Sequence, residues 1–198
     1  MHFDALFAEF YKLLEHDDVS VQEVIDVFGK SGHLLSIFVL VLPFCQPIPL
    51  PGLSTPLGIS ISILAVLYLF NRVPQLPKWL GDRKIPQTAL HAFVKVIHRI
   101  LGWIQKIVKP RFAVFAGSEL VKIYICVIMI VSGILLALPL PIPFSNTVPA
   151  IVILCAAIGY LFKDALTLFL SFLISIGMSV FFWGIFAAAS QGWNYIKQ

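Results

Sequence analysis

The strongest constraint on the fold of this chain is a 24-residue stretch that occurs twice. Residues 47–70 read PIPLPGLSTPLGISISILAVLYLF, and residues 139–162 read PLPIPFSNTVPAIVILCAAIGYLF. They align without a gap at an offset of 92 positions, with ten identical pairs that include three alternating prolines and a closing Tyr-Leu-Phe. Proline-interrupted apolar segments at corresponding places in two halves of a membrane protein point to a binding site. We therefore predict an internal duplication, and we call residues 47–51 and 139–143 the two proline knots.

Composition indicates that lipid is part of the solvent of this fold. The chain has 198 residues, of which 59% are hydrophobic and 12% are charged, and its mean hydropathy is +0.94. Soluble domains carry about 25% charged residues. We therefore expect an all-α integral membrane protein. The N-terminus is acidic and amphipathic, so we expect no cleavable signal peptide.

The positive charge of the chain is concentrated between the two halves. Nine basic residues and one acidic residue lie between Arg72 and Arg111, whereas seven of the ten acidic residues precede residue 27. Cytoplasmic loops of inner-membrane proteins carry this excess of Lys and Arg. We therefore predict a multi-pass membrane protein with the N-terminus and region 71–118 in the cytoplasm. The apolar remainder leaves no soluble domain to bind nucleic acid.

The apolar runs differ in whether they are long enough to cross a bilayer. Residues 34–45 would form a helix of about 18 Å, short of a hydrocarbon core of about 30 Å, and residues 58–70 are equally short. Each copy is therefore expected to form a proline-tipped hairpin, re-entrant or broken, that is buried in protein or lines a polar cavity. Residues 120–138 form a longer run in which Lys122 is expected to snorkel, and the uncharged residues 165–190 are long enough for a C-terminal transmembrane span.

The remaining segments are expected to lie outside the bilayer. Residues 3–16 predict a short amphipathic helix, and Ser20 and Glu23 form a capping-box pattern before a second helix. Residues 87–108 predict a basic amphipathic helix, either on the inner membrane surface or packed on the protein itself. This gives an N-terminal region at 1–32, a first membrane hairpin at 33–72, a basic cytoplasmic region at 73–118, and a second hairpin with the C-terminal span at 119–198.

Polar residues that follow each knot are the candidate binding site. Ser, Thr and Asn favour the N-cap of a helix, and helix N-termini carry partial positive charge. Two such ends that converge in the membrane would suit a phosphate or carboxylate. The alternative is that the caps and prolines only terminate short helices. The candidate anion-binding residues are Gly52, Ser54, Thr55, Asn146 and Thr147.

Three charged residues follow the repeated Tyr-Leu-Phe, namely Arg72, Lys163 and Asp164. A charge deep in a membrane is a functional hypothesis by default, but each of these residues stands at a predicted helix end, which favours interfacial anchoring. Tyr68 and Tyr160 fit an aromatic belt at the membrane surface.

The sequence contains no pattern typical of catalysis. We find no nucleophile elbow, zinc-protease motif, phosphate-binding loop or dinucleotide fingerprint. The three cysteines lie in apolar stretches without metal-ligand spacing. We therefore expect no catalytic residues, no metal and no cofactor, and a protein that is not an enzyme.

Four segments give the chain a resemblance to the ExoD family of bacterial membrane proteins. They are Ser20–Gly32 (SVQEVIDVFGKSG), Pro47–Gly58 (PIPLPGLSTPLG), the Pro-Lys-Trp-Leu at 77–80, and Pro141–Pro149 (PIPFSNTVP). The resemblance covers nearly the whole chain after residue 18 and leaves the helix at 3–16 outside. It implies an inner-membrane protein linked to exopolysaccharide production and to alkaline sensitivity, without supplying a mechanism.

These observations favour a non-enzymatic membrane protein that supports exopolysaccharide production by binding or translocating an anionic lipid carrier. Its expected partners are membrane lipids, such as a polyprenyl phosphate or another anionic lipid, and protein partners in a membrane assembly. One alternative is a proton- or cation-coupled transporter for alkaline stress, for which Asp164 is the only candidate membrane carboxylate. The other alternative is a structural subunit of a membrane assembly.

Overall fold

The structure is a computed structural model whose described residues form mainly helices. It describes residues 19–20, 23, 33–45, 52–72, 84–88, 91, 94–95, 99, 102–104, 106, 108–140, 142 and 144–196. The prolines of the first knot and the amphipathic helix predicted at 3–16 lie outside these residues.

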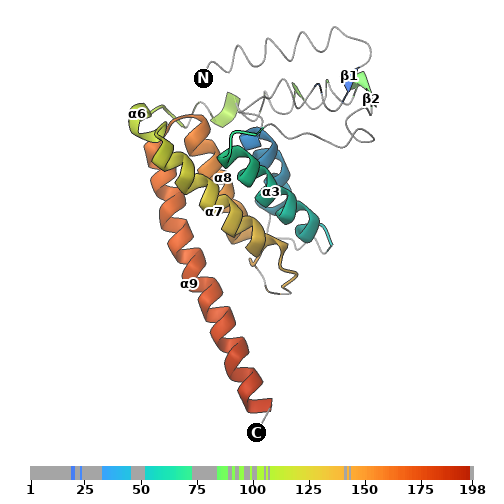
Figure 1. Ribbon diagram of the computed structural model, residues 1–198, viewed down its shortest axis with the longest axis vertical. Helices are drawn as coiled ribbons and strands as arrows, with labels where there is room; N and C mark the ends of the chain where they lie inside the picture. The colour runs from blue at the N-terminus through green and yellow to red at the C-terminus, as the bar shows by residue number, and fades with distance from the viewer. Residues whose placement is uncertain are drawn as a thin grey trace.

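The helices follow one another in two antiparallel pairs and a final long helix (Figure 1). Residues 33–41 are helical and continue into η1 (Leu42–Cys45), after which the chain turns back through α3 (Ser54–Leu69). A short helix, α6 (Ala113–Ala116), precedes α7 (Glu119–Ala137), and α8 (Thr147–Leu161) returns alongside it. The last helix is α9 (Ala165–Ile196), whose C-terminal part extends beyond the other helices. The expectation of a helical fold is confirmed.

The helices pack crosswise between the two halves of the chain. The second helix of the first half, α3, packs along the first helix of the second half, α7, while α8 packs against η1, α7 and α9. Phe38, Ile125, Met129, Leu136 and Ile153 are among the largest fully buried side chains of this core. The two halves therefore share one hydrophobic core.

Two glycines let α3 and α7 approach closely. A Cβ added at Gly58 would lie 2.5 Å from the carbonyl oxygen of Gly133, and one added at Gly133 would overlap the hydroxyl of Ser62. That hydroxyl donates to the carbonyl oxygens of Gly58, at 3.0 Å, and Ile130, at 3.2 Å. Small residues and hydroxyls that join closely packed helices are typical of membrane interiors. Gly58 therefore serves helix packing.

Two of the described helices are long and apolar enough to cross a membrane, judged by length and composition. They are Glu119–Ala137 and Ala165–Ala188, and the apolar helices at His33–Cys45, Ser54–Leu69 and Thr147–Leu161 are shorter. The prediction of short helices on either side of the first knot and after the second knot is confirmed. At about 1.5 Å per residue, α3 is about 24 Å long and α9 about 48 Å long.

The described residues of the region between the two halves pack against the rest of the protein. Residues 84–85 form β2 (Lys84–Ile85), which pairs antiparallel with β1 (Val19–Ser20), a pairing that we did not predict. In the predicted basic helix, Val94 is buried and Ile104 packs against the core, whereas Lys95 is exposed. This favours the alternative in which the helix packs on the protein itself.

The capping box predicted near the N-terminus is confirmed. The backbone N–H of Glu23 donates to the hydroxyl of Ser20 at 3.2 Å, and the N–H of Ser20 donates to the carboxylate of Glu23 at 2.8 Å. This reciprocal pair needs only residues three positions apart.

Candidate functional site

The residues after the first knot do not cap α3 as predicted. The N-cap residue is Leu53, and among the described residues α3 has no side-chain hydrogen bond at its N-cap. Ser54 is the first helical residue and is buried. The hydroxyl of Thr55 instead donates to the carbonyl oxygen of Ala137 at 2.9 Å. This oxygen lies at the end of α7, where backbone carbonyls lack helical donors, so Thr55 stabilises a different helix from the predicted one.

The capping prediction is also wrong for the second knot. Asn146 occupies the N-cap position of α8, but its φ of −91° and ψ of −35° are helical, and its side chain makes no cap bond. N-cap residues normally adopt extended backbone angles, which point their side chains at the first turn. The Asn146 Oδ1 atom is buried and has no hydrogen-bond partner among the residues that the structure describes. Thr147 is the first helical residue.

The two knots nevertheless lead into similar backbone turns at one end of the helical bundle. Gly52 has a φ of 86°, and Phe144, 92 positions later, has a φ of 65°. Positive φ is readily adopted by glycine but is uncommon for phenylalanine. The Thr55–Ala137 hydrogen bond joins the start of α3 to the end of α7, next to the second knot. The structure thus brings Thr55 close to the end of α7, two residues before the second knot.

The three charged candidates lie at helix ends, at the other end of the bundle. Arg72 and Lys163 are exposed beyond the C-termini of α3 and α8. Asp164 is buried, and its carboxylate accepts from the N–H of Leu166 at 3.2 Å and from the hydroxyl of Thr167 at 2.8 Å. The bond from the Leu166 N–H is that of a helix N-cap, and the Thr167 hydroxyl holds the other carboxylate oxygen. Asp164 therefore starts α9, in agreement with the helix-end interpretation.

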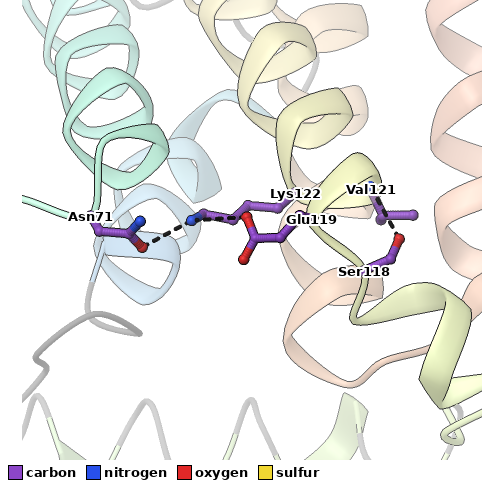
Figure 2. A network of polar contacts seen from close by, with 5 residues as sticks. All are labelled: Asn71, Ser118, Glu119, Val121 and Lys122. Atoms are coloured by element: carbon purple, nitrogen blue, oxygen red, sulfur yellow. Dashed lines mark hydrogen bonds and ion pairs between the residues drawn. The ribbon is translucent and has the colours of Figure 1, made fainter.

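The prediction that Lys122 snorkels is wrong. Lys122 is only 5% exposed, and its ammonium donates to Oδ1 of Asn71 at 2.9 Å. Figure 2 shows the Lys122 side chain reaching from α7 towards Asn71, at the end of α3, with the Glu119 carboxylate beside it. The distance from the ammonium to Glu119 is 3.5 Å, and the Glu119 side chain is 84% exposed. Lys122 thus points into the contact between the two halves.

Aromatic rings lie beside the polar cluster of Lys122, Asn71 and Glu119. The Lys122 ammonium lies 5.6 Å from the centroid of the Tyr68 ring, within the range of a cation–π contact. Tyr68 contacts Tyr160 edge to face at 6.2 Å and His33 at 5.8 Å, measured between ring centroids. Tyr68 is buried, so it does not belong to an exposed aromatic belt. Two sequence features indicate this cluster. They are Lys122, a single cation in an apolar run, and the tyrosine that both repeats share, Tyr68 and Tyr160.

Together, these features describe a helical protein with two helices long and apolar enough to cross a membrane. Its two polar regions lie at opposite ends of α3 and α7. Comparison with known proteins identifies the family to which this protein belongs. The family described as "Exopolysaccharide synthesis, ExoD" matches residues 4–184, and the chain belongs to this family. The match begins near the N-terminus, so our exclusion of residues 3–16 from the family is wrong.

Two relatives agree with this assignment. The chain is 30% identical over 165 residues to Protein ExoD of Rhizobium meliloti, covering 83% of this chain and 69% of that protein. It is 28% identical over 158 residues to an uncharacterized protein of Synechocystis sp., covering 79% of this chain and 74% of that protein. No solved structure matches the chain.

Proposed function

We propose that this chain is a multi-pass inner-membrane protein that supports exopolysaccharide production by binding an anionic lipid carrier at its proline knots. Membership in a family implicated in exopolysaccharide synthesis supports the general role. The carrier of a growing polysaccharide unit combines a long apolar chain with a phosphate, and polyprenyl phosphate has this chemistry. Such a ligand needs an apolar surface beside an anion site.

We also propose an internal duplication, which the backbone geometry at the C-termini of α3 and α8 supports. Asn71 and Lys163, 92 positions apart, have φ values of 53° and 54°. Each follows a helix whose last turn is closed by the same six-to-one hydrogen bond, from Arg72 N to Leu67 O at 2.9 Å and from Asp164 N to Gly159 O at 2.8 Å. In Figure 1, α3 and α8 run in the same direction. Both hairpins would then enter the membrane from one side, with region 71–118 in the cytoplasm.

One observation carries the anion site: within the described part of the chain, neither the N-cap residue of α3 nor that of α8 makes a side-chain cap bond. Helix N-termini leave backbone N–H groups without intrahelical acceptors, and these groups together with the helix dipole attract anions. The site would consist of the backbone around Gly52, Ser54, Thr55, Asn146 and Thr147. Because the Thr55 hydroxyl is bonded to Ala137, we assign the attraction to the backbone N–H groups of Ser54 and Thr55. In α8, the N–H of Val148 donates to the carbonyl oxygen of Phe144 at 3.0 Å, and proline, the third residue of both helices, has no N–H.

A single substitution separates anion binding from helix stability. The Asn146 side chain makes no cap bond, so Asn146→Asp breaks none at the start of α8, and it adds a negative charge where the helix dipole favours one. We expect this variant to bind polyprenyl phosphate at least about tenfold more weakly in native mass spectrometry, a change of about 1.4 kcal/mol. Asn146→Ser, which changes the side chain without adding a charge, is the matched control. Equal affinity in the folded Asp variant would contradict the anion site.

A second candidate function, a structural subunit of a membrane assembly, has its own support. The C-terminal part of α9 extends beyond the other helices (Figure 1). Trp183 and Phe186 of α9 are exposed and suit contact with lipid or with another protein. The proton-coupled alternative is less favoured, because Asp164, its candidate carboxylate, is bonded as a helix cap.

A further inference from the structure

Among the residues that the structure describes, the partners of the buried Lys122 ammonium neutralise its charge incompletely. Its shortest described hydrogen bond goes to Asn71, a neutral acceptor, at 2.9 Å. Its ion pair with Glu119 is 3.5 Å long, whereas a charge-assisted N–H···O hydrogen bond measures about 2.7–2.9 Å. The Glu119 side chain is 84% exposed, so water screens its charge. A buried charge with this degree of pairing favours an additional anionic partner.

The surface around Lys122 combines polar donors with apolar side chains. Asn71 is held in left-handed backbone geometry at the end of α3, and the Arg72 that follows is exposed. Next to these polar groups along the chain, Phe70 on one helix and Leu120 and Ile123 on the other are exposed. A charged head that reaches Lys122 would therefore have apolar surface beside it for acyl chains.

We propose that Lys122, Asn71 and Arg72 bind the phosphate of an anionic phospholipid headgroup, whose acyl chains lie on Phe70, Leu120 and Ile123. Lys122 supplies the buried charge and Arg72 an exposed one. The Asn71 side chain accepts from Lys122 through its oxygen, which leaves its amide nitrogen to donate to the phosphate. Glu119 competes with the phosphate for Lys122 and can turn into water when the lipid binds.

This site is separate from the one proposed at the knots. Lys122 lies near the start of α7 and Asn71 at the end of α3, whereas the knots adjoin the opposite ends of the same helices. The 16 residues of α3 separate the two regions by about 24 Å. Either site can therefore fail without the other.

Native mass spectrometry of the full chain in detergent tests the proposal with dioleoyl phosphatidylglycerol as the probe. Dioleoyl phosphatidylcholine, which has no net charge, is the reference lipid. We expect Lys122→Gln to weaken phosphatidylglycerol binding by about tenfold, the effect of one charge-assisted hydrogen bond. We expect Glu119→Gln to strengthen it by at least about twofold, because the competing carboxylate is removed. Lys106→Gln, which removes another exposed cation, is the control and should bind like the unchanged protein.

The Glu119 variant keeps the proposal falsifiable if Lys122→Gln does not fold, because an exposed side chain tolerates substitution. Unchanged phosphatidylglycerol affinity in folded Glu119→Gln would overturn the proposal. So would equal weakening of both lipids by Lys122→Gln. Displacement of all Lys122-dependent lipid binding by millimolar inorganic phosphate would overturn the lipid assignment in favour of free phosphate. Asn146→Asp should leave this site unchanged.

Discussion

Several polar residues in this protein connect segments that are distant in sequence. The Thr55 hydroxyl bonds a carbonyl 82 residues away, and Lys122 bonds a side chain 51 residues away. The caps at Ser20, Ser118 and Asp164 are local. A hydroxyl or an ammonium in an apolar environment must find a partner, and the shared core of the two halves supplies one.

At the residue scale, Asp164 is expected to matter for stability. Asp164→Ala removes the acceptors for Leu166 and Thr167 and should lower the free energy of unfolding by about 1 kcal/mol. Denaturant unfolding in detergent measures the change. Asp164→Asn keeps an acceptor and should be close to the unchanged protein. A loss of exopolysaccharide production in a stable Asn variant would instead support proton coupling through this carboxylate.

At the scale of elements, the molecule depends on the close contact between α3 and α7. The contact needs Gly58 and Gly133 because a Cβ at either position meets the opposing helix. The crosswise arrangement makes this contact an interface between the two halves, so it fixes the position of both polar regions.

Substitution of these glycines tests the contact. Gly58→Ala should destabilise the fold by about 1–3 kcal/mol, the usual cost of overpacking. Gly177→Ala is the matched control, because a Cβ there meets nothing within 4 Å, and it should be neutral or stabilising by up to about 1 kcal/mol. Thermal unfolding in one detergent compares the two. Equal melting temperatures would mean that α3 and α7 are not closely packed.

Features that depend on residues close in sequence could be predicted, whereas contacts between distant segments could not. The short helices, the Ser20–Glu23 box and the helix ends could be predicted because proline, capping and hydrophobic periodicity act locally. The burial of Lys122 could not, since it depends on Tyr68 and Asn71 across the bundle. The caps at Thr55 and Asn146 were mispredicted because a residue type favours a cap only when its backbone is extended.

At the scale of the whole molecule, the proposed topology has a direct consequence for accessibility. With both hairpins entering from the cytoplasm, a cysteine placed at exposed Lys109 should react with an impermeant thiol reagent only after the inner membrane is opened. The three native cysteines would first be replaced by alanine or serine. Labelling of this position from the periplasm of intact spheroplasts would reverse the orientation.

We propose that the protein binds a lipid through its phosphate. A comparison of polyprenyl phosphate with the uncharged polyprenol of the same length tests this directly. Both share the apolar chain, so the difference in affinity isolates the anion. In native mass spectrometry of the unchanged full chain, we predict at least about tenfold tighter binding of the phosphate, or about 1.4 kcal/mol. Equal affinities for the two lipids would contradict the account.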